Sequence, residues 1–161
     1  MDLHIKPATE ADVPIVLRMI AALADYERLS QEMSVTEEGL RAALFGPRPF
    51  AEAVIGSAES EPVGYAIFFH NFSTFRGAPG LYLEDLFVYP QHRGRGYGKR
   101  LLEHVAGIAV SRGCPRFEWC VLDWNESAIS FYRKAGAVVL DDWRICRMTG
   151  DALRALGRAG G

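Results

Sequence analysis

One junction in the middle of the chain constrains its fold more than any other feature. The run Leu81–Tyr89 is rich in apolar and aromatic residues, as a β-strand is, and Pro90 ends it. A glycine-rich basic segment follows, and residues 96–112 then carry apolar side chains at helical spacing until Gly113. This succession of strand, loop and helix predicts an α/β chain in which helices pack against a sheet with parallel pairing.

The rest of the chain alternates between strand-like and helix-like segments. Thr9 and Thr36 are candidate N-caps of two early helices, and Gly46 and Pro47 end the second. Strands are expected at residues 3–5, 50–57, 63–69, 81–89 and 117–122, and helices at residues 10–28, 36–45, 96–112, 125–134 and 151–156. Residues 71–80 are expected to form a loop, and residues 137–148 a last strand or a hairpin. The order βααβββαβαβ, without repeat or linker, predicts a single domain over residues 1–161.

The composition excludes several classes of protein. Hydrophobic residues make up 49% of the chain and charged residues 24%, the balance of a folded domain rather than of a disordered one. No apolar run approaches the roughly 18 residues of a membrane helix, and the N-terminus lacks a signal-peptide pattern. We therefore expect a cytoplasmic location and no membrane partner. The 18 Lys and Arg against 20 Asp and Glu leave a net charge of −2, which argues against nucleic acid as a partner.

The cysteines and histidines show no ligand spacing. Three cysteines without a CxxC pair support neither a disulfide framework nor a zinc site, and the four histidines are scattered. We expect no metal. Cys120 and Cys146 lie in apolar, strand-like runs and are expected in the core.

The glycine-rich segment is a candidate anion site. Gly94, Gly96 and Gly98 let backbone amides approach a ligand closely, and the helix that follows aims its N-terminal dipole at the same place. The cluster has four basic residues, Arg93, Arg95, Lys99 and Arg100, and no acid. The spacing matches neither a Walker loop nor the dinucleotide-binding pattern, so a diphosphate of another kind is indicated. The alternative is a solvated glycine turn that only joins strand to helix.

At these residues the chain resembles a known superfamily. Val88-x4-Arg93-x-x-Gly96-x-Gly98 is similar to the acetyl-CoA pyrophosphate motif of the GCN5-related N-acetyltransferases (GNAT). Residues 82–88, and Trp124-Asn125-Glu126-x5-Tyr132, resemble the diamine (spermidine/spermine) acetyltransferases and their thialysine-acetylating relatives. The resemblance implies an α/β (α+β) fold with a central mixed, twisted sheet flanked by helices on both faces. It also implies acetyl-CoA as cosubstrate and a homodimer.

The resemblance assigns the cofactor residues. The Val88 amide would hold the acetyl carbonyl, and the backbone amides from Arg93 to Lys99 would hold the pyrophosphate. The full set of expected cofactor contacts is Leu86, Val88, Arg93, Gly94, Arg95, Gly96, Tyr97, Gly98, Lys99 and Asn125.

The resemblance further implies direct attack of an amine on acetyl-CoA in a ternary complex, with Glu84 and Tyr132 as catalytic residues. An alkyl ammonium has a pKa of about 10.4, so its deprotonation at pH 7 costs roughly 4–5 kcal/mol and requires a base. On a regular strand Glu84 shares a face with Leu86 and Val88 and lies about 13 Å from Val88, which favours proton removal through water. Tyr132 matches the general acid that protonates the departing thiolate. The alternatives are a strand-end ion pair for Glu84 and a core position for Tyr132.

The acceptor is expected to be a small primary amine. Tyr26, Glu27, Glu84 and Trp143 match positions that line the amine site of the family, and Arg18 is a further candidate. Asp85 lies beside Glu84 on the opposite face of the strand and ranks below it among the expected substrate-binding residues, with a place behind the site or at an interface as the alternative. Acids and aromatic rings suit an ammonium group. Ser73 stands near where the polyamine enzymes place an acid, so a lysine-like amino acid or a short diamine is favoured over spermine.

Two other functions keep the same cofactor residues. Acetylation of a protein or peptide would change only the acceptor cleft. A non-catalytic regulatory domain that binds acetyl-CoA would not need Glu84 or Tyr132.

Overall fold

A computed structural model describes residues 2–160, which form two compact units that meet in sequence between Cys120 and Val121. The first unit is built on a five-stranded sheet in the order β1-β2-β3-β4-β5. Its strands are β1 (His4–Pro7), β2 (Glu52–Ala58), β3 (Glu61–Ser73), β4 (Ala78–Val88) and β5 (Phe117–Glu118). Neighbouring strands are antiparallel except β4 and β5, which are parallel, so the sheet is mixed.

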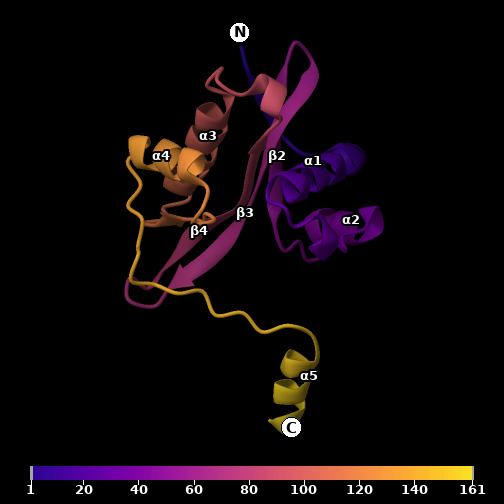
Figure 1. Ribbon diagram of the computed structural model, residues 1–161, viewed down its shortest axis with the longest axis vertical. Coiled ribbons are helices and arrows are strands. Elements are labelled where there is room, and N and C mark those ends of the chain that lie inside the picture. The colour runs from indigo at the N-terminus through magenta and orange to yellow at the C-terminus, as the bar shows by residue number, and fades with distance from the viewer. Residues whose placement is uncertain (1, 161) are drawn as a thin grey trace. The chain divides into compact units, whose positions relative to one another are not determined.

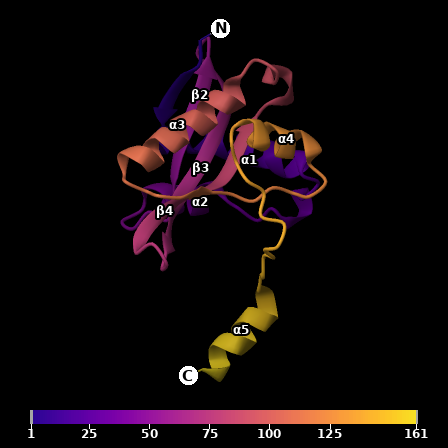
Figure 2. The ribbon, with the colours of Figure 1, turned by 90° about the vertical axis from the view of Figure 1, so that its left-hand side faces the viewer.

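Helices cover both faces of this sheet. Figures 1 and 2 show α1 (Val13–Tyr26) and α2 (Glu37–Phe45) on one face and α3 (Tyr97–Ser111) on the other. Short 3₁₀ turns precede or follow them: η1 (Glu10–Asp12), η2 (Ser30–Glu32) and η3 (Pro90–His92). The expected fold class is confirmed.

The core on the α1 and α2 face is built from alternate strand residues and the apolar stripe of each helix. Tyr65, Ile67 and Phe87 point from β3 and β4 toward Val16 and Met19 of α1 in one buried cluster. On the other face, Gly64 allows close packing of β4 and α3, because a Cβ there would meet the Phe87 carbonyl oxygen at 2.5 Å and Leu101 of α3 at 3.2 Å.

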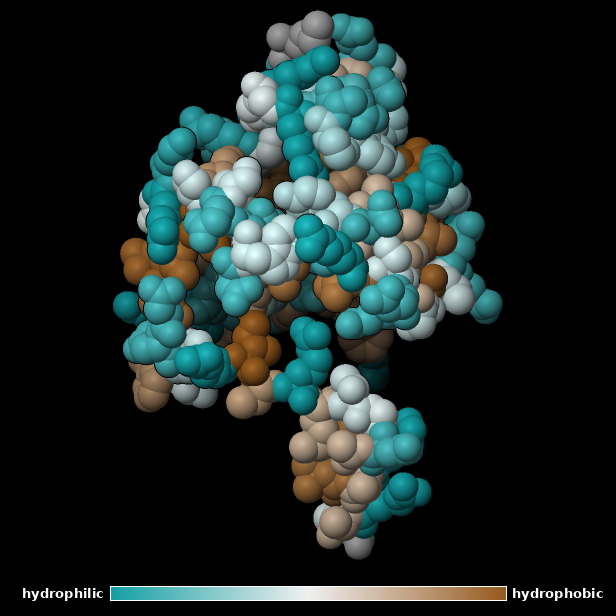
Figure 3. All heavy atoms as spheres, in the orientation of Figure 1, coloured by the Kyte–Doolittle hydropathy of each residue, from teal (hydrophilic) through white to brown (hydrophobic). Residues whose placement is uncertain are grey.

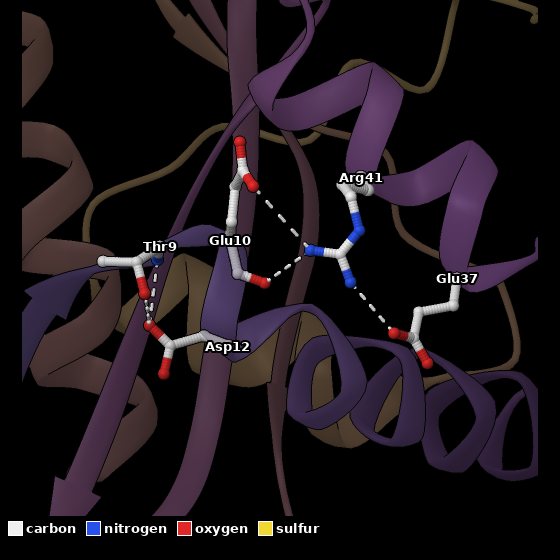
Figure 4. Close-up of polar contacts among 5 residues, drawn as sticks. All are labelled: Thr9, Glu10, Asp12, Glu37 and Arg41. Carbon is white, nitrogen blue, oxygen red and sulfur yellow. Dashed lines mark hydrogen bonds and ion pairs between the residues drawn. The ribbon is translucent and has the colours of Figure 1, made fainter.

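Thr36 caps α2 as predicted, whereas Thr9 caps the 3₁₀ turn η1, which leads into α1 at Val13. The Thr9 amide and hydroxyl donate to Asp12 Oδ2 at 2.9 and 2.8 Å, and the Gly39 amide donates to Thr36 Oγ1 at 3.0 Å. Arg41 of α2 joins this helix to η1, because its guanidinium donates to the Glu10 carbonyl at 3.0 Å; it also donates to Glu37 within α2 at 3.0 Å (Figure 4).

The expectation of a loop over residues 71–80 is wrong. β3 continues to Ser73 and β4 begins at Ala78, with Asn71 opposite Gly80 and Phe72 opposite Pro79. Only residues 74–77 form the turn, which Gly77 allows with a φ of +60°. Pro79 and Gly80 are residue types that normally interrupt strands, but here they lie in β4 and pair with β3 across a long hairpin.

The second unit contains α4 (Glu126–Lys134) and α5 (Gly150–Ala159). The expected strand or hairpin at residues 137–148 is wrong, since this segment has no regular secondary structure, and the strand expected at 117–122 stops at Glu118. Cys120 and Cys146 are exposed rather than in the core, because neither lies in a paired strand. α5 is amphipathic, and Figure 3 shows brown on one side of this C-terminal helix. Its side chains Leu153 and Leu156 are exposed.

Candidate active site

The carboxyl end of β4 has an open edge. β5 pairs only with Leu81 and Tyr82, so the strand from residue 83 to Val88 lacks a partner on that side within residues 2–160. The Tyr89 amide donates to the Val63 carbonyl of β3 at 3.0 Å. Since successive amides of a strand point to opposite sides, the Val88 amide points away from β3, toward the open edge. The Val88 carbonyl accepts a bond from Arg93 Nε at 2.9 Å. Leu86 lies two residues before Val88, on the same face of β4.

The glycine loop that follows β4 has the shape of an anion cradle. Gly94 and Gly96 adopt φ values of +76° and +81°, which side chains rarely tolerate, and no atom lies within 4 Å of where a Cβ would stand on either. α3 begins at Tyr97, and the Arg100 amide makes the bond to the Gly96 carbonyl that starts the helix. The amides of residues 97–99 therefore precede the first helical bond and are available to a ligand. No acidic residue stands in the first turn of α3, so the loop fits a diphosphate.

The side chains of the basic cluster are largely engaged within the protein. Lys99 pairs with Glu103 at 3.3 Å and Arg100 with Asp2 at 3.0 Å. The Tyr97 ring is buried, at 2% exposure, so only its backbone can face a ligand. Backbone amides are thus the main donors that this loop offers.

Arg93 connects the glycine loop to the end of α1 and to β4. Its guanidinium carbon lies 4.2 Å from the centre of the Tyr26 ring, at the end of α1, and 5.8 Å from that of Phe87. Its backbone amide donates to the Pro90 carbonyl at 3.2 Å. The backbone amide and Nε of Arg93 thus bond within the protein and help to shape the loop.

A β-bulge changes the geometry expected at Glu84. In the pairing of β3 with β4, Ile67 lies opposite Asp85 and Phe68 opposite Leu83, so Glu84 is the extra residue. The expectation of a regular strand through Glu84 is therefore wrong. Glu84 is exposed, and Asp85 turns to the α1 face of the sheet.

Asp85 is the most perturbed carboxyl group near this edge. Its Oδ2 accepts a hydrogen bond of 2.9 Å from the hydroxyl of Tyr65. Burial raises the pKa of Asp85 to about 6; Glu84 and Glu27 add to the rise, and the Tyr65 bond opposes it. Burial also raises the pKa of Glu27. Shifts of this kind are typical of residues that bind or exchange a proton.

Glu27 and Asp85 face a common pocket of about 350 Å³ between α1, the segment after α1 and β4. The structure thus brings Tyr26, Glu27, Asp85 and Arg93 together. Three other candidates of the first unit do not line the pocket: Arg18 is exposed on α1, Glu84 is exposed on β4, and Ser73 is buried at the end of β3.

The remaining candidates belong to the second unit. Asn125 caps α4, since its Oδ1 accepts a bond of 3.2 Å from the Ala128 amide. Tyr132 lies on α4 with its ring 5.1 Å from that of Phe131. Trp143 is 74% exposed in the irregular segment.

Two residues of the first unit were missed by sequence reasoning. Tyr65 binds Asp85 from 20 positions away, and Glu32 lines the pocket from η2. Neither belongs to a motif, although the acid in a polar turn after α1 was visible in the sequence.

Comparisons with known proteins identify the family and the fold. A model of the Acetyltransferase (GNAT) family matches residues 19–137. The thialysine N-epsilon-acetyltransferase of Bos taurus is 39% identical, over 94% of this chain and 95% of the relative. The L-ornithine N5-acetyltransferase of Arabidopsis thaliana is 34% identical, over 96% and 88%. An integron cassette protein of V. cholerae has a structure similar to this one, with a TM-score of 0.81 and 25% identity over 98% and 99% of the two chains.

The chain therefore belongs to the GNAT acetyltransferase family. It is an acetyl-CoA-dependent N-acetyltransferase, as the resemblance of its motifs implies. No helix within residues 2–160 has the length and apolar character needed to cross a membrane, and the described residues hold no cluster of three or more potential metal ligands.

Proposed function

We propose that this enzyme acetylates the primary amine of a small molecule by direct attack on acetyl-CoA. The observation that carries this proposal is the pocket in which Glu27 and Asp85 meet, connected to the glycine loop through the contact of Arg93 with Tyr26. The names of the relatives point the same way, because thialysine and ornithine are small amines.

The cofactor residues are supported by the shape of the loop. The amides of residues 94–99 and the N-terminus of α3 would hold the pyrophosphate, and the Val88 amide at the open edge would donate to the acyl oxygen. When bound, acetyl-CoA supplies a thioester carbonyl that an amine can attack. We assign Asn125 the role of positioning α4 at its N-cap, in addition to the cofactor contact implied by the family motif.

The acceptor side must bind an ammonium and then remove its proton. Glu27 and Asp85 supply negative charge inside the pocket, and Tyr26, which precedes Glu27 at the end of α1, would add its ring to the binding of the ammonium. Glu84, exposed next to Asp85, would pass the proton to water. The family motif assigns Tyr132 the protonation of the leaving thiolate, and the resemblance assigns Trp143 to amine binding.

The pocket favours a small amine over a protein or peptide acceptor. A volume of about 350 Å³ matches a short alkyl amine, and its wall is largely apolar. A regulatory domain without catalysis would not need a carboxyl group whose pKa is raised to about 6 at the acceptor side.

Three further features of the protein belong to the proposal. The family match runs through both units, which supports a single domain over residues 1–161. The exposed apolar side chains of Val138 and Ile145 support a homodimer that covers them. The free thiols of the three cysteines suit a reducing, cytoplasmic compartment.

Acetylation of an amine panel tests the proposal. Purified protein with acetyl-CoA is offered lysine, thialysine, ornithine, short diamines, spermidine, spermine and a lysine peptide, and products are followed by mass spectrometry. Faster acetylation of small amines than of the peptide is expected. A peptide that reacts faster than every small amine would favour the protein-acetylating alternative.

A further inference from the structure

The acceptor pocket is lined by apolar and acidic residues and one serine, without a cationic side chain. Six of the ten residues around it are apolar: Ile20, Leu23, Ala24, Leu29, Met33 and Val35. The other four are Glu27, Glu32, Ser34 and Asp85. None of the ten is Lys, Arg or His, so this lining suits an alkyl chain with positive charges and offers nothing to pair with a carboxylate.

The three carboxylates of the pocket differ in their surroundings. Glu27 and Asp85 are partly buried, whereas Glu32 is exposed at the end of η2. Among residues 2–160, no ion pair involves Glu32. An acid that borders an apolar pocket without a cationic partner is placed to meet a cation on the ligand.

We propose that Glu32 is a specificity-determining residue that pairs with a second positive charge on the acceptor. This inference rests on the proposed function: the reacting ammonium is met by Glu27 and Asp85, and the methylene chain lies against the apolar wall. A far ammonium then reaches Glu32. The enzyme would thereby distinguish dicationic acceptors from monocationic amines of the same length.

Two amines matched in length provide the test. Acetylation of 1,5-diaminopentane and of pentylamine is measured with the unmodified enzyme, with Glu32→Gln and with Glu59→Gln. Glu59 is an exposed acid in the turn after β2, outside the pocket, so its variant controls for the loss of one negative charge.

In Glu32→Gln we expect the KM for diaminopentane to rise about twofold to fivefold, with kcat and the KM for pentylamine unchanged. The difference in the KM for diaminopentane between the unmodified enzyme and Glu32→Gln should shrink at high ionic strength, because the ion pair between Glu32 and the ammonium is solvent-exposed. An equal change for both amines, an unchanged KM for diaminopentane, or the same effect in Glu59→Gln would overturn the inference.

A binding measurement separates this inference from the proposed function. If the unmodified enzyme acetylates no amine, the proposed function fails. The Kd values of the two amines, from titrations followed by NMR, still test Glu32. The preference for diaminopentane should fall in Glu32→Gln, and an unchanged ratio of Kd values would overturn the role of Glu32.

Discussion

At the scale of single residues, the glycine loop requires a backbone conformation at Gly96 that other residues tolerate poorly. Its φ of +81° is strained for any side chain and most for a branched one. We expect Gly96→Val to reduce the affinity for CoA at least about tenfold, since the loop can no longer present its amides. Calorimetric titration with CoA measures this. Gly107→Ala, in open space on α3, is the matched control, and unaltered affinity in Gly96→Val would contradict the assignment of the loop.

The bond from Tyr65 to Asp85 predicts a pH effect. This bond favours the ionised carboxylate, so Tyr65→Phe should raise the pKa of Asp85 above its value of about 6. If ionised Asp85 binds the ammonium, kcat/KM falls as the pH drops through that pKa. In Tyr65→Phe, the midpoint of the acid limb of the pH profile of kcat/KM should then lie about one pH unit higher.

Protein stability gives an independent check on Asp85. Its pKa in the folded protein lies above the ordinary value, so between pH about 4 and 6 the native state binds more protons than the unfolded state. This group therefore lowers the free energy of unfolding as the pH rises through that window. Asp85→Asn should remove that slope in denaturant titrations, and a slope equal to that of the unmodified protein would argue against the raised pKa.

Tyr132 is assigned as the general acid on the strength of its motif. Tyr132→Phe keeps the ring that packs on Phe131 and removes the hydroxyl that would supply the proton. Turnover should fall by about 10²–10⁴, with little change in CoA affinity. Stopped-flow measurement of the chemical step decides this, and an unaltered rate would leave Tyr132 a packing residue.

At the scale of secondary-structure elements, Arg93 joins the glycine loop to α1 and β4. The contact with Tyr26 and the bond to the Val88 carbonyl are both lost in Arg93→Ala. We expect this variant to lower the free energy of unfolding by about 1–3 kcal/mol. The coupling between Arg93→Ala and Tyr26→Leu should be about 0.5–1 kcal/mol in a double-mutant cycle. Strict additivity would show that the ring contact contributes nothing, and Arg48→Ala serves as an exposed control.

At the scale of the whole molecule, exposed apolar side chains predict self-association. Val138, Trp143 and Ile145 are exposed by 80%, 74% and 68% in a segment without regular structure. Analytical ultracentrifugation should find twice the mass of one chain, and Ile145→Asp should shift the equilibrium toward the monomer. A single chain at all concentrations would contradict the proposed homodimer.

The sequence by itself determined the features that depend on local chemistry. The helix starts at Thr9 and Thr36, the left-handed turns at Gly94 and Gly96, and the strand that Pro90 ends are each set by a few adjacent residues. The family motif at residues 88–98 lies in the same stretch, so the sequence alone predicts the fold class and the acetyltransferase activity.

Only the tertiary structure decided how the acceptor side is built. The bulge at Glu84 follows from the register between β3 and β4, and the raised pKa of Asp85 follows from its burial. Arg93 packs on Tyr26, which is far away in the sequence, and Glu32 reaches the pocket only because the chain turns back after α1. These features depend on contacts between segments whose distance and register no local pattern encodes, so they became visible only once the chain was folded.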